Sequence, residues 1–163
     1  MNNQKRLFHY TTMNALSSIL KDAEIKPATA FIEKSESPAV WCSFNPIWEE
    51  TANKGYFQPS KNLVIPLTKE QTHELSGGLL RFEVSPESAP HNWSEFRKMS
   101  GISRKAFRSL EKINRYLGIN AQRNWRISFC PIHEDSWKSI EFWDGKEWKP
   151  CIDEDEKEVK RYE

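Results

Sequence analysis

Short apolar segments separated by polar turns recur along this chain. Residues 7–10 are apolar apart from one His, and Leu79–Val84 alternates apolar side chains with more polar ones. Such runs are typical of strands, and the alternating run predicts a strand with one buried face. Further runs predict strands at residues 39–44, 62–67, 125–130 and 139–143.

The first strand and the stretch after it form one predicted unit. Thr11 or Thr12 can cap a following helix through its side-chain hydroxyl. That helix gathers apolar side chains on one face, at Met13, Leu16, Ile19 and Leu20. The unit predicts that His9 lies where the strand ends, and a polar side chain there needs a partner.

The longest helical stretch is 93–117, which predicts two helices that meet at Gly101, the second capped by Ser103. One face of the second helix is apolar, at Ala106, Leu110, Ile113 and Leu117. The other face is basic, at Arg104, Lys105, Arg108, Lys112 and Arg115. Such a face is usually solvated, but with a Trp near each end it can also guide a nucleic acid by phosphate contacts.

The order of elements predicts an α+β domain. Asp144-Gly145 between two apolar runs is a strong hairpin signal. Strands outnumber strand–helix–strand units, which favours a mixed or antiparallel sheet with an N-terminal helix and a helical insertion. We expect one domain over residues 1–152 and a charged tail over 153–163.

Composition narrows the classes of protein without selecting one. The formal net charge is +1, so overall charge does not argue for nucleic acid. Cys42, Cys130 and Cys151 have neither disulfide nor zinc-site spacing, and the four His are scattered, so no metal site is expected. No run suggests a signal peptide or a membrane span, so a cytoplasmic setting without membrane contact is expected.

Two stretches carry a resemblance to a known family. LFHYTTMNALSSILKDAEIKP, residues 7–27, resembles the opening of small bacterial and phage proteins of the ADP-ribosyltransferase-like fold. Many of these begin with a strand, a His-Tyr-Thr element and a helix, although a Gly usually stands where this chain has Asp22-Ala23-Glu24. VWCSFNPIWE, residues 40–49, resembles their second strand, where an aromatic and a Ser or Thr line the dinucleotide pocket.

The resemblance implies a split sheet and an NAD-dependent ADP-ribosyltransferase that works in toxin–antitoxin, phage defence or counter-defence biology. NAD is then the substrate, and the acceptor, a protein or a nucleic acid among others, stays open. A non-catalytic binding module on the same fold is the first alternative. A nucleic-acid-binding protein that uses the basic helices over 97–126 is the second.

The same resemblance assigns roles to single residues. His9 would hold the adenosine-side ribose, with Tyr10 and Thr11 beside it. Position along the chain suggests the other roles. Trp41, Ser43 and Asn45 alternate along one strand face and would line the pocket. Trp48 would stack on a ring or pack, and Arg126, which interrupts a strand, would bind pyrophosphate or form a cross-strand ion pair. Core packing for Trp41 and a backbone bond for His9 are the alternatives.

Glu141 is the expected catalytic carboxylate, because it interrupts a late apolar strand. It would stabilise an oxocarbenium-like ribose through the 2′-hydroxyl. Ser139 stands where the family's fuller signature has Gln or Glu, which argues against modification of protein arginine. Glu83 and Glu49 are the substitutes. His9, Ser43 and Glu141 are expected to face one cleft.

Overall fold

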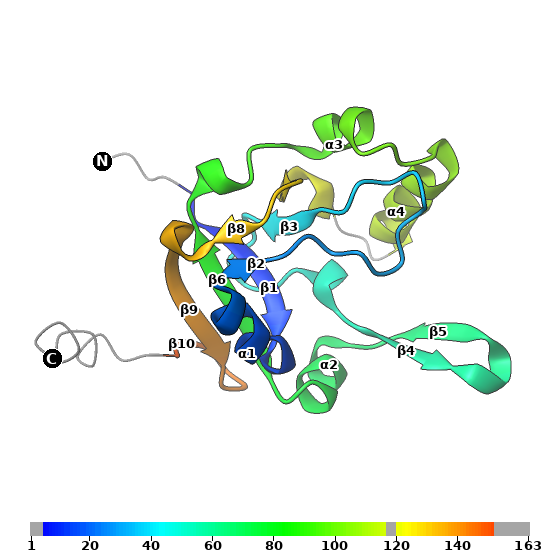
Figure 1. Ribbon diagram of the computed structural model, residues 1–163. Helices are drawn as coiled ribbons and strands as arrows, with labels where there is room; N and C mark the ends of the chain where they lie inside the picture. The colour runs from blue at the N-terminus through cyan, green and yellow to red at the C-terminus, as the bar shows by residue number, and fades with distance from the viewer. Residues whose placement is uncertain (1–4, 117–119, 152–163) are drawn as a thin grey trace, which may run out of the picture.

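Strand β1 (Leu7–Thr12) lies inside a six-stranded antiparallel sheet with the order β10-β9-β6-β1-β3-β7 (Figure 1). The other strands of this sheet are β3 (Val40–Ser43), β6 (Leu79–Val84), β7 (Trp125–Ser128), β9 (Trp137–Trp143) and β10 (Trp148–Pro150). The computed structural model describes residues 5–116 and 120–151. An α+β fold with antiparallel sheets is therefore confirmed, and the expected tail lies outside the described residues.

Two small sheets complete the strand set. Strand β2 (Glu24–Ile25) pairs with β8 (Ile132–His133), and β4 (Gly55–Gln58) pairs with β5 (Leu63–Pro66). The sequence pattern predicted only β5 among these four. Two-residue strands and the Gly-containing β4 are too short to give a periodicity, which explains the omission.

Helix α1 (Met13–Asp22) begins after Thr12, but no side chain caps it. The main chain of the Ser76–Gly78 turn accepts its first amides instead: Met13 N–H donates to the Gly78 carbonyl at 2.9 Å and Asn14 N–H to the Ser76 carbonyl at 3.3 Å. The expected hydroxyl cap is therefore wrong. The expected strand end at His9 is wrong too, because β1 continues to Thr12.

The two sides of the sheet are covered by different elements. On the side that we call the back face, Leu7, Phe82 and Cys42 pack with Ile19 of α1 and Ile132 of β8. On the front face, helices cover β3 and β7, and a loop covers β1 and β6. Phe8 packs there with Tyr10, Leu79 and Trp48, and Phe96 packs with Trp125 and Ile127.

Three further helices are α2 (Lys69–Leu75), α3 (Trp93–Met99) and α4 (Arg104–Tyr116). The expected break at Gly101 is confirmed, with φ +75° and a Ser35 carbonyl so close that a Cβ would stand 2.3 Å from it. Ser103 caps α4 as expected, because its Oγ accepts the Ala106 N–H at 3.1 Å. Glu33 binds the Ser103 amide and hydroxyl in turn.

The packed face of α4 differs from the expected one. Phe107 and Asn114 are its buried residues, whereas Ile113 is 49% exposed. Phe107 stacks on Trp93 with 4.3 Å between ring centroids. An aromatic ring on the neighbouring helix α3 therefore sets which side of α4 faces inward, and the aliphatic spacing of the helix does not reveal this.

Of all neighbouring strands in the sheet, β1 and β3 share the fewest paired residues. Only Phe8 and Ser43 pair between them, whereas β1 and β6 pair at six positions. Beyond Phe8, the His9 ring reaches across, and its Nδ1 lies 2.9 Å from the Trp41 carbonyl oxygen. Because a carbonyl only accepts, Nδ1 carries the proton of this bond.

Candidate functional site

His9 and Ser43 lie on opposite faces of the sheet. Phe8 pairs with Ser43, and His9 pairs with Phe82 on the other side of β1. Side chains alternate along a strand, so His9 points toward the back face and Ser43 toward the front. The expectation that these residues share a cleft is wrong. Burial lowers the pKa of His9 to about 4, which fits a neutral ring bound to the main chain.

Glu141 lies on the front face, because Tyr10 pairs with Arg81 and Arg81 pairs with Glu141. The expectation that it shares a cleft with His9 is therefore also wrong. Its carboxylate forms an ion pair with the buried Arg81 guanidinium and a second one, at 3.2 Å, with Arg6. The catalytic role of Glu141 stays a prediction, but both of its oxygens already face cations.

Three other predicted binding residues lie apart from Ser43 and Asn45. Trp41 packs in the aromatic core, with its ring 4.7 Å from Phe96. Thr11 is buried on the back face, and Arg126 lies over the Phe44 ring at 4.8 Å. The Arg126 guanidinium also donates to the Trp125 carbonyl. Their roles in binding are untested, and none of the three lines the cavity described below.

The end of β3 brings the other predicted residues together. Asn45-Pro46 stops the strand, and Ser43 Oγ accepts the Asn45 N–H at 3.1 Å. The Asn45 side chain then binds two main-chain groups of the same turn: Oδ1 accepts the Ile47 N–H and Nδ2 donates to the Trp48 carbonyl. The turn reverses the chain and brings Glu49 back over Ser43.

Glu49 is a carboxylate that is 7% exposed. Ser43 Oγ donates to its Oε2 at 2.8 Å, and Thr51 Oγ1 donates to its Oε1 at 3.1 Å. Within residues 5–116 and 120–151, no ion pair forms at Glu49. Each carboxylate oxygen has two acceptor positions, so each can accept one more hydrogen bond.

Tyr10 and Trp48 hold this loop against the sheet. The Tyr10 hydroxyl donates to the Asn45 carbonyl, and burial raises the pKa of Tyr10 to about 12. Trp48 is 4% exposed, packs edge-on against Tyr10 at 5.2 Å, and donates from Nε1 to Asn53 Oδ1. Both aromatic residues therefore hold the loop in place, and the surface of Trp48 is covered in this conformation.

A cavity of about 400 Å³ opens beside this loop. Its lining consists of Asn45, Glu49, Glu50, Asn120, Ala121, Arg123 and Asn124. A 3-10 turn, Ala121–Arg123, supplies one wall and is tied to the end of β3 by the Phe44 N–H, which donates to the Asn124 carbonyl at 3.0 Å. The cavity is within the size range of small-molecule sites.

The lining can recognise a ligand that is rich in hydroxyl and amide groups. Carboxylates accept hydrogen bonds from hydroxyls, Asn side chains both donate and accept, and Arg123 can bind a phosphate. Asn45 was a predicted binding residue and Glu49 a substitute acid, whereas Glu50, Arg123 and the amides of Asn120 and Asn124 were not among the predicted site residues. Asn124 sits just before a predicted strand, in the kind of loop where ligand contacts gather, and only that position signals it.

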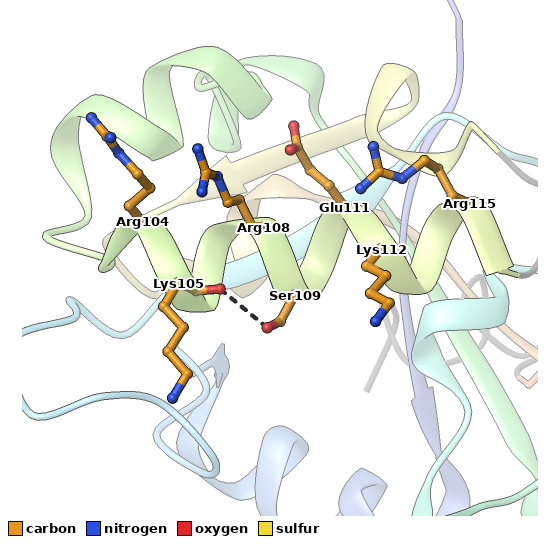
Figure 2. A pocket seen from close by; sticks show the side chains of 7 residues that line it. All are labelled: Arg104, Lys105, Arg108, Ser109, Glu111, Lys112 and Arg115. Atoms are coloured by element: carbon orange, nitrogen blue, oxygen red, sulfur yellow. Dashed lines mark hydrogen bonds between the residues drawn. The ribbon is translucent and has the colours of Figure 1, made fainter.

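A second, open surface of about 650 Å³ runs along α4 (Figure 2). Arg104, Arg108, Glu111 and Arg115 project to one side of the helix, and Lys105 and Lys112 to the other. The prediction that Arg104, Lys105, Arg108 and Arg115 are exposed is confirmed, and Lys112 is exposed as well. None of them forms an ion pair with another described residue.

No family model, no curated protein and no solved structure matches this chain. Among the described residues, no helix is long and apolar enough to cross a membrane. The same residues contain no cluster of three or more His, Cys, Asp or Glu arranged to hold a metal ion. The geometry of the two surfaces above is therefore the basis for a functional proposal.

Proposed function

We propose that the chain is an NAD-dependent ADP-ribosyltransferase-like protein whose substrate binds in the cavity beside Ser43 and Glu49. The observation that carries this proposal is the buried Glu49 carboxylate, which borders a cavity of about 400 Å³ lined mostly by polar residues and has no cationic partner among the described residues. The resemblance of residues 40–49 to the second strand of the family adds to it.

Transfer of ADP-ribose would break the bond between the nicotinamide nitrogen and ribose C1′. Nicotinamide leaves with the bonding electron pair, and an oxygen or nitrogen of the acceptor bonds to C1′ and gives up its proton. Glu49 is suited to accept a hydrogen bond from the ribose 2′-hydroxyl, which favours the positive charge that develops on the ring. Arg123 is suited to the pyrophosphate.

Two measurements on the whole chain separate an enzyme from a binding module. Calorimetric titration with NAD tests binding, and release of free nicotinamide tests cleavage. We expect both in the wild type, with NAD binding weakened about tenfold or more in Arg123→Ala. Binding without nicotinamide release would favour the non-catalytic module. Absence of binding would overturn the proposal.

A second candidate function is nucleic-acid binding by α4, in place of NAD chemistry or as the site for an acceptor. Five exposed cations without an ion-pair partner in the described part of the chain favour it. Lys and Arg side chains that neutralise phosphates release the counterions condensed on the nucleic acid, so affinity should fall steeply with salt.

Fluorescence anisotropy with a labelled oligonucleotide tests this second candidate. Arg108→Glu combined with Lys112→Glu should weaken binding and reduce the slope of log affinity against log salt by about 0.9 per lost contact. The control is Lys21→Glu combined with Lys138→Glu, which makes the same charge change on α1 and β9. Equal losses in both variants would identify a non-local charge effect.

A further inference from the structure

The β4–β5 ribbon projects away from the rest of the molecule (Figure 1). It forms a separate two-stranded sheet, with Tyr56 opposite Ile65 and Phe57 opposite Val64. All of its large apolar side chains are exposed by 39–54%: Tyr56, Phe57, Leu63, Val64 and Ile65. No other part of the described chain gathers as many exposed apolar side chains in one element.

Both faces of this ribbon are apolar. The register places Tyr56, Leu63 and Ile65 on one face, and Phe57 and Val64 on the other. A ribbon that rests on its own domain buries one face and presents polar side chains on the other. Here neither face is buried and neither face is polar, so the sequence of the ribbon suits contact with another molecule.

The base of the ribbon is fixed to the body, so its projection is built into the fold. Leu67 N–H donates to the Lys54 carbonyl at 2.9 Å and closes the two ends. Lys54 N–H donates to Oγ1 of the fully buried Thr72 on α2 at 3.1 Å. A two-stranded ribbon without further support is only marginally stable in water, so a contact over its outer part would stabilise it.

The edges of the ribbon are also unprotected. Lys61, in the turn, is its single charged residue over positions 55–66, although 29% of the whole chain is charged. Edge strands that stay unpaired usually carry charges that prevent pairing with another strand. An almost uncharged ribbon also gives phosphates nothing to bind, which argues against nucleic acid as its partner.

We propose that the β4–β5 ribbons of two copies of this chain pack against each other and form a homodimer. A second copy meets the requirements of the surface, because it brings the same uncharged edges and apolar faces to a two-fold axis. Over the two faces together, the five side chains expose on the order of 500 Å², which is more than half of the ~800 Å² that each partner contributes to a stable interface.

Analytical ultracentrifugation of the whole chain over a range of micromolar concentrations tests this proposal. We expect a monomer–dimer equilibrium for the wild type. Phe57→Glu combined with Val64→Glu alters one face, and Tyr56→Glu combined with Ile65→Glu alters the other. At least one pair should raise the dissociation constant about a hundredfold or more, the scale of losing central apolar contacts.

The matched control is Leu20→Glu combined with Phe31→Glu, which places the same charges at exposed apolar positions outside the ribbon. This variant should dimerise like the wild type, and circular dichroism should show that all variants are folded. A wild type that sediments as a monomer at every concentration overturns the proposal, and so does a dimer that survives both ribbon variants. A wild-type monomer that instead co-sediments with phosphatidylcholine vesicles would assign the ribbon to a lipid surface.

Discussion

Glu49 and Glu141 are two carboxylates on the front face of one sheet, and their surroundings are opposite. Glu141 lies between two guanidinium groups, Arg81 and Arg6. Glu49 is held by the hydroxyls of Ser43 and Thr51 and borders a cavity. A charge that is neutralised within the protein contributes to the fold, whereas one held only by neutral donors can respond to a ligand.

The largest expected effect is a difference between the Glu49 and Glu141 variants in the rate of nicotinamide release. Glu49→Gln should lower nicotinamide release from NAD by roughly two to three orders of magnitude, because it removes one preorganised negative charge from the transition state. Glu141→Gln should change the rate per folded molecule much less. Single-turnover kinetics at saturating NAD measure both. Equal losses would contradict the assignment of Glu49, and a loss in Glu141→Gln alone would restore Glu141 as the acid.

The second effect is on the free energy of unfolding, where the Glu141 variant should lose more than the Glu49 variant. Glu141→Gln leaves the buried Arg81 without its closest carboxylate and should lower the free energy of unfolding by about 3 kcal/mol. Glu49→Gln removes a buried charge that has no cation partner in the described chain, so its stability should change by less than about 1 kcal/mol. Urea denaturation measures both. Identical losses would mean that Glu49 is also a structural ion.

His9 is a partly buried ionisable group that stays neutral. Its folded pKa is about 4 and its usual value is 6.5, so the unfolded chain binds a proton first as the pH falls. The free energy of unfolding should therefore decrease between pH 6.5 and about 4, by up to ~1.4 kcal/mol per pH unit. His9→Gln should flatten this part of the profile. His133→Gln, at an exposed position, is the control and should leave it unchanged.

The smallest effect concerns the hydroxyls that hold Glu49. Ser43→Ala removes a donor to the carboxylate and the acceptor of the Asn45 N–H, and should lower the free energy of unfolding by about 1 kcal/mol. Thr51→Val removes only one donor and should cost less. Thermal and urea denaturation of both variants test this order. A larger loss in Thr51→Val would show that the turn does not depend on Ser43.

Local patterns in the sequence predicted much of the fold. The Leu79–Val84 strand, the break at Gly101 and the Asp144-Gly145 hairpin all depend on residues close in the chain. Even there, the prediction of a single buried face was wrong, because β6 is buried on both faces and Arg81 is buried with it. Burial of the second face depends on the loop after β3 and on Trp148, which are distant in sequence.

The site was harder to predict because register and pairing are not local. A shift of one residue in the register of β1 would place His9 instead of Tyr10 on the same sheet face as Ser43. Nothing in the sequence of β1 fixes that register. The sequence did not show that Glu141 has a cationic partner, because that partner, Arg81, is in a different strand. Glu49 was only a substitute acid, although the Asn45-Pro46 turn, which reverses the chain before it, was visible in the sequence.

The single paired position between β1 and β3 has a mechanical consequence. Six paired positions join β1 to β6 and four join β3 to β7. The sheet therefore consists of two well-paired halves that share one paired position. The cavity at Glu49 lies beside the half that contains β3 and β7. The Tyr10 hydroxyl, from the other half, donates a hydrogen bond to the Asn45 carbonyl. Hydrogen bonds from His9, Arg81 and Trp148 also cross to Trp41 and to the loop after β3, so a rotation of one half against the other would act on these side-chain contacts and on the single paired position.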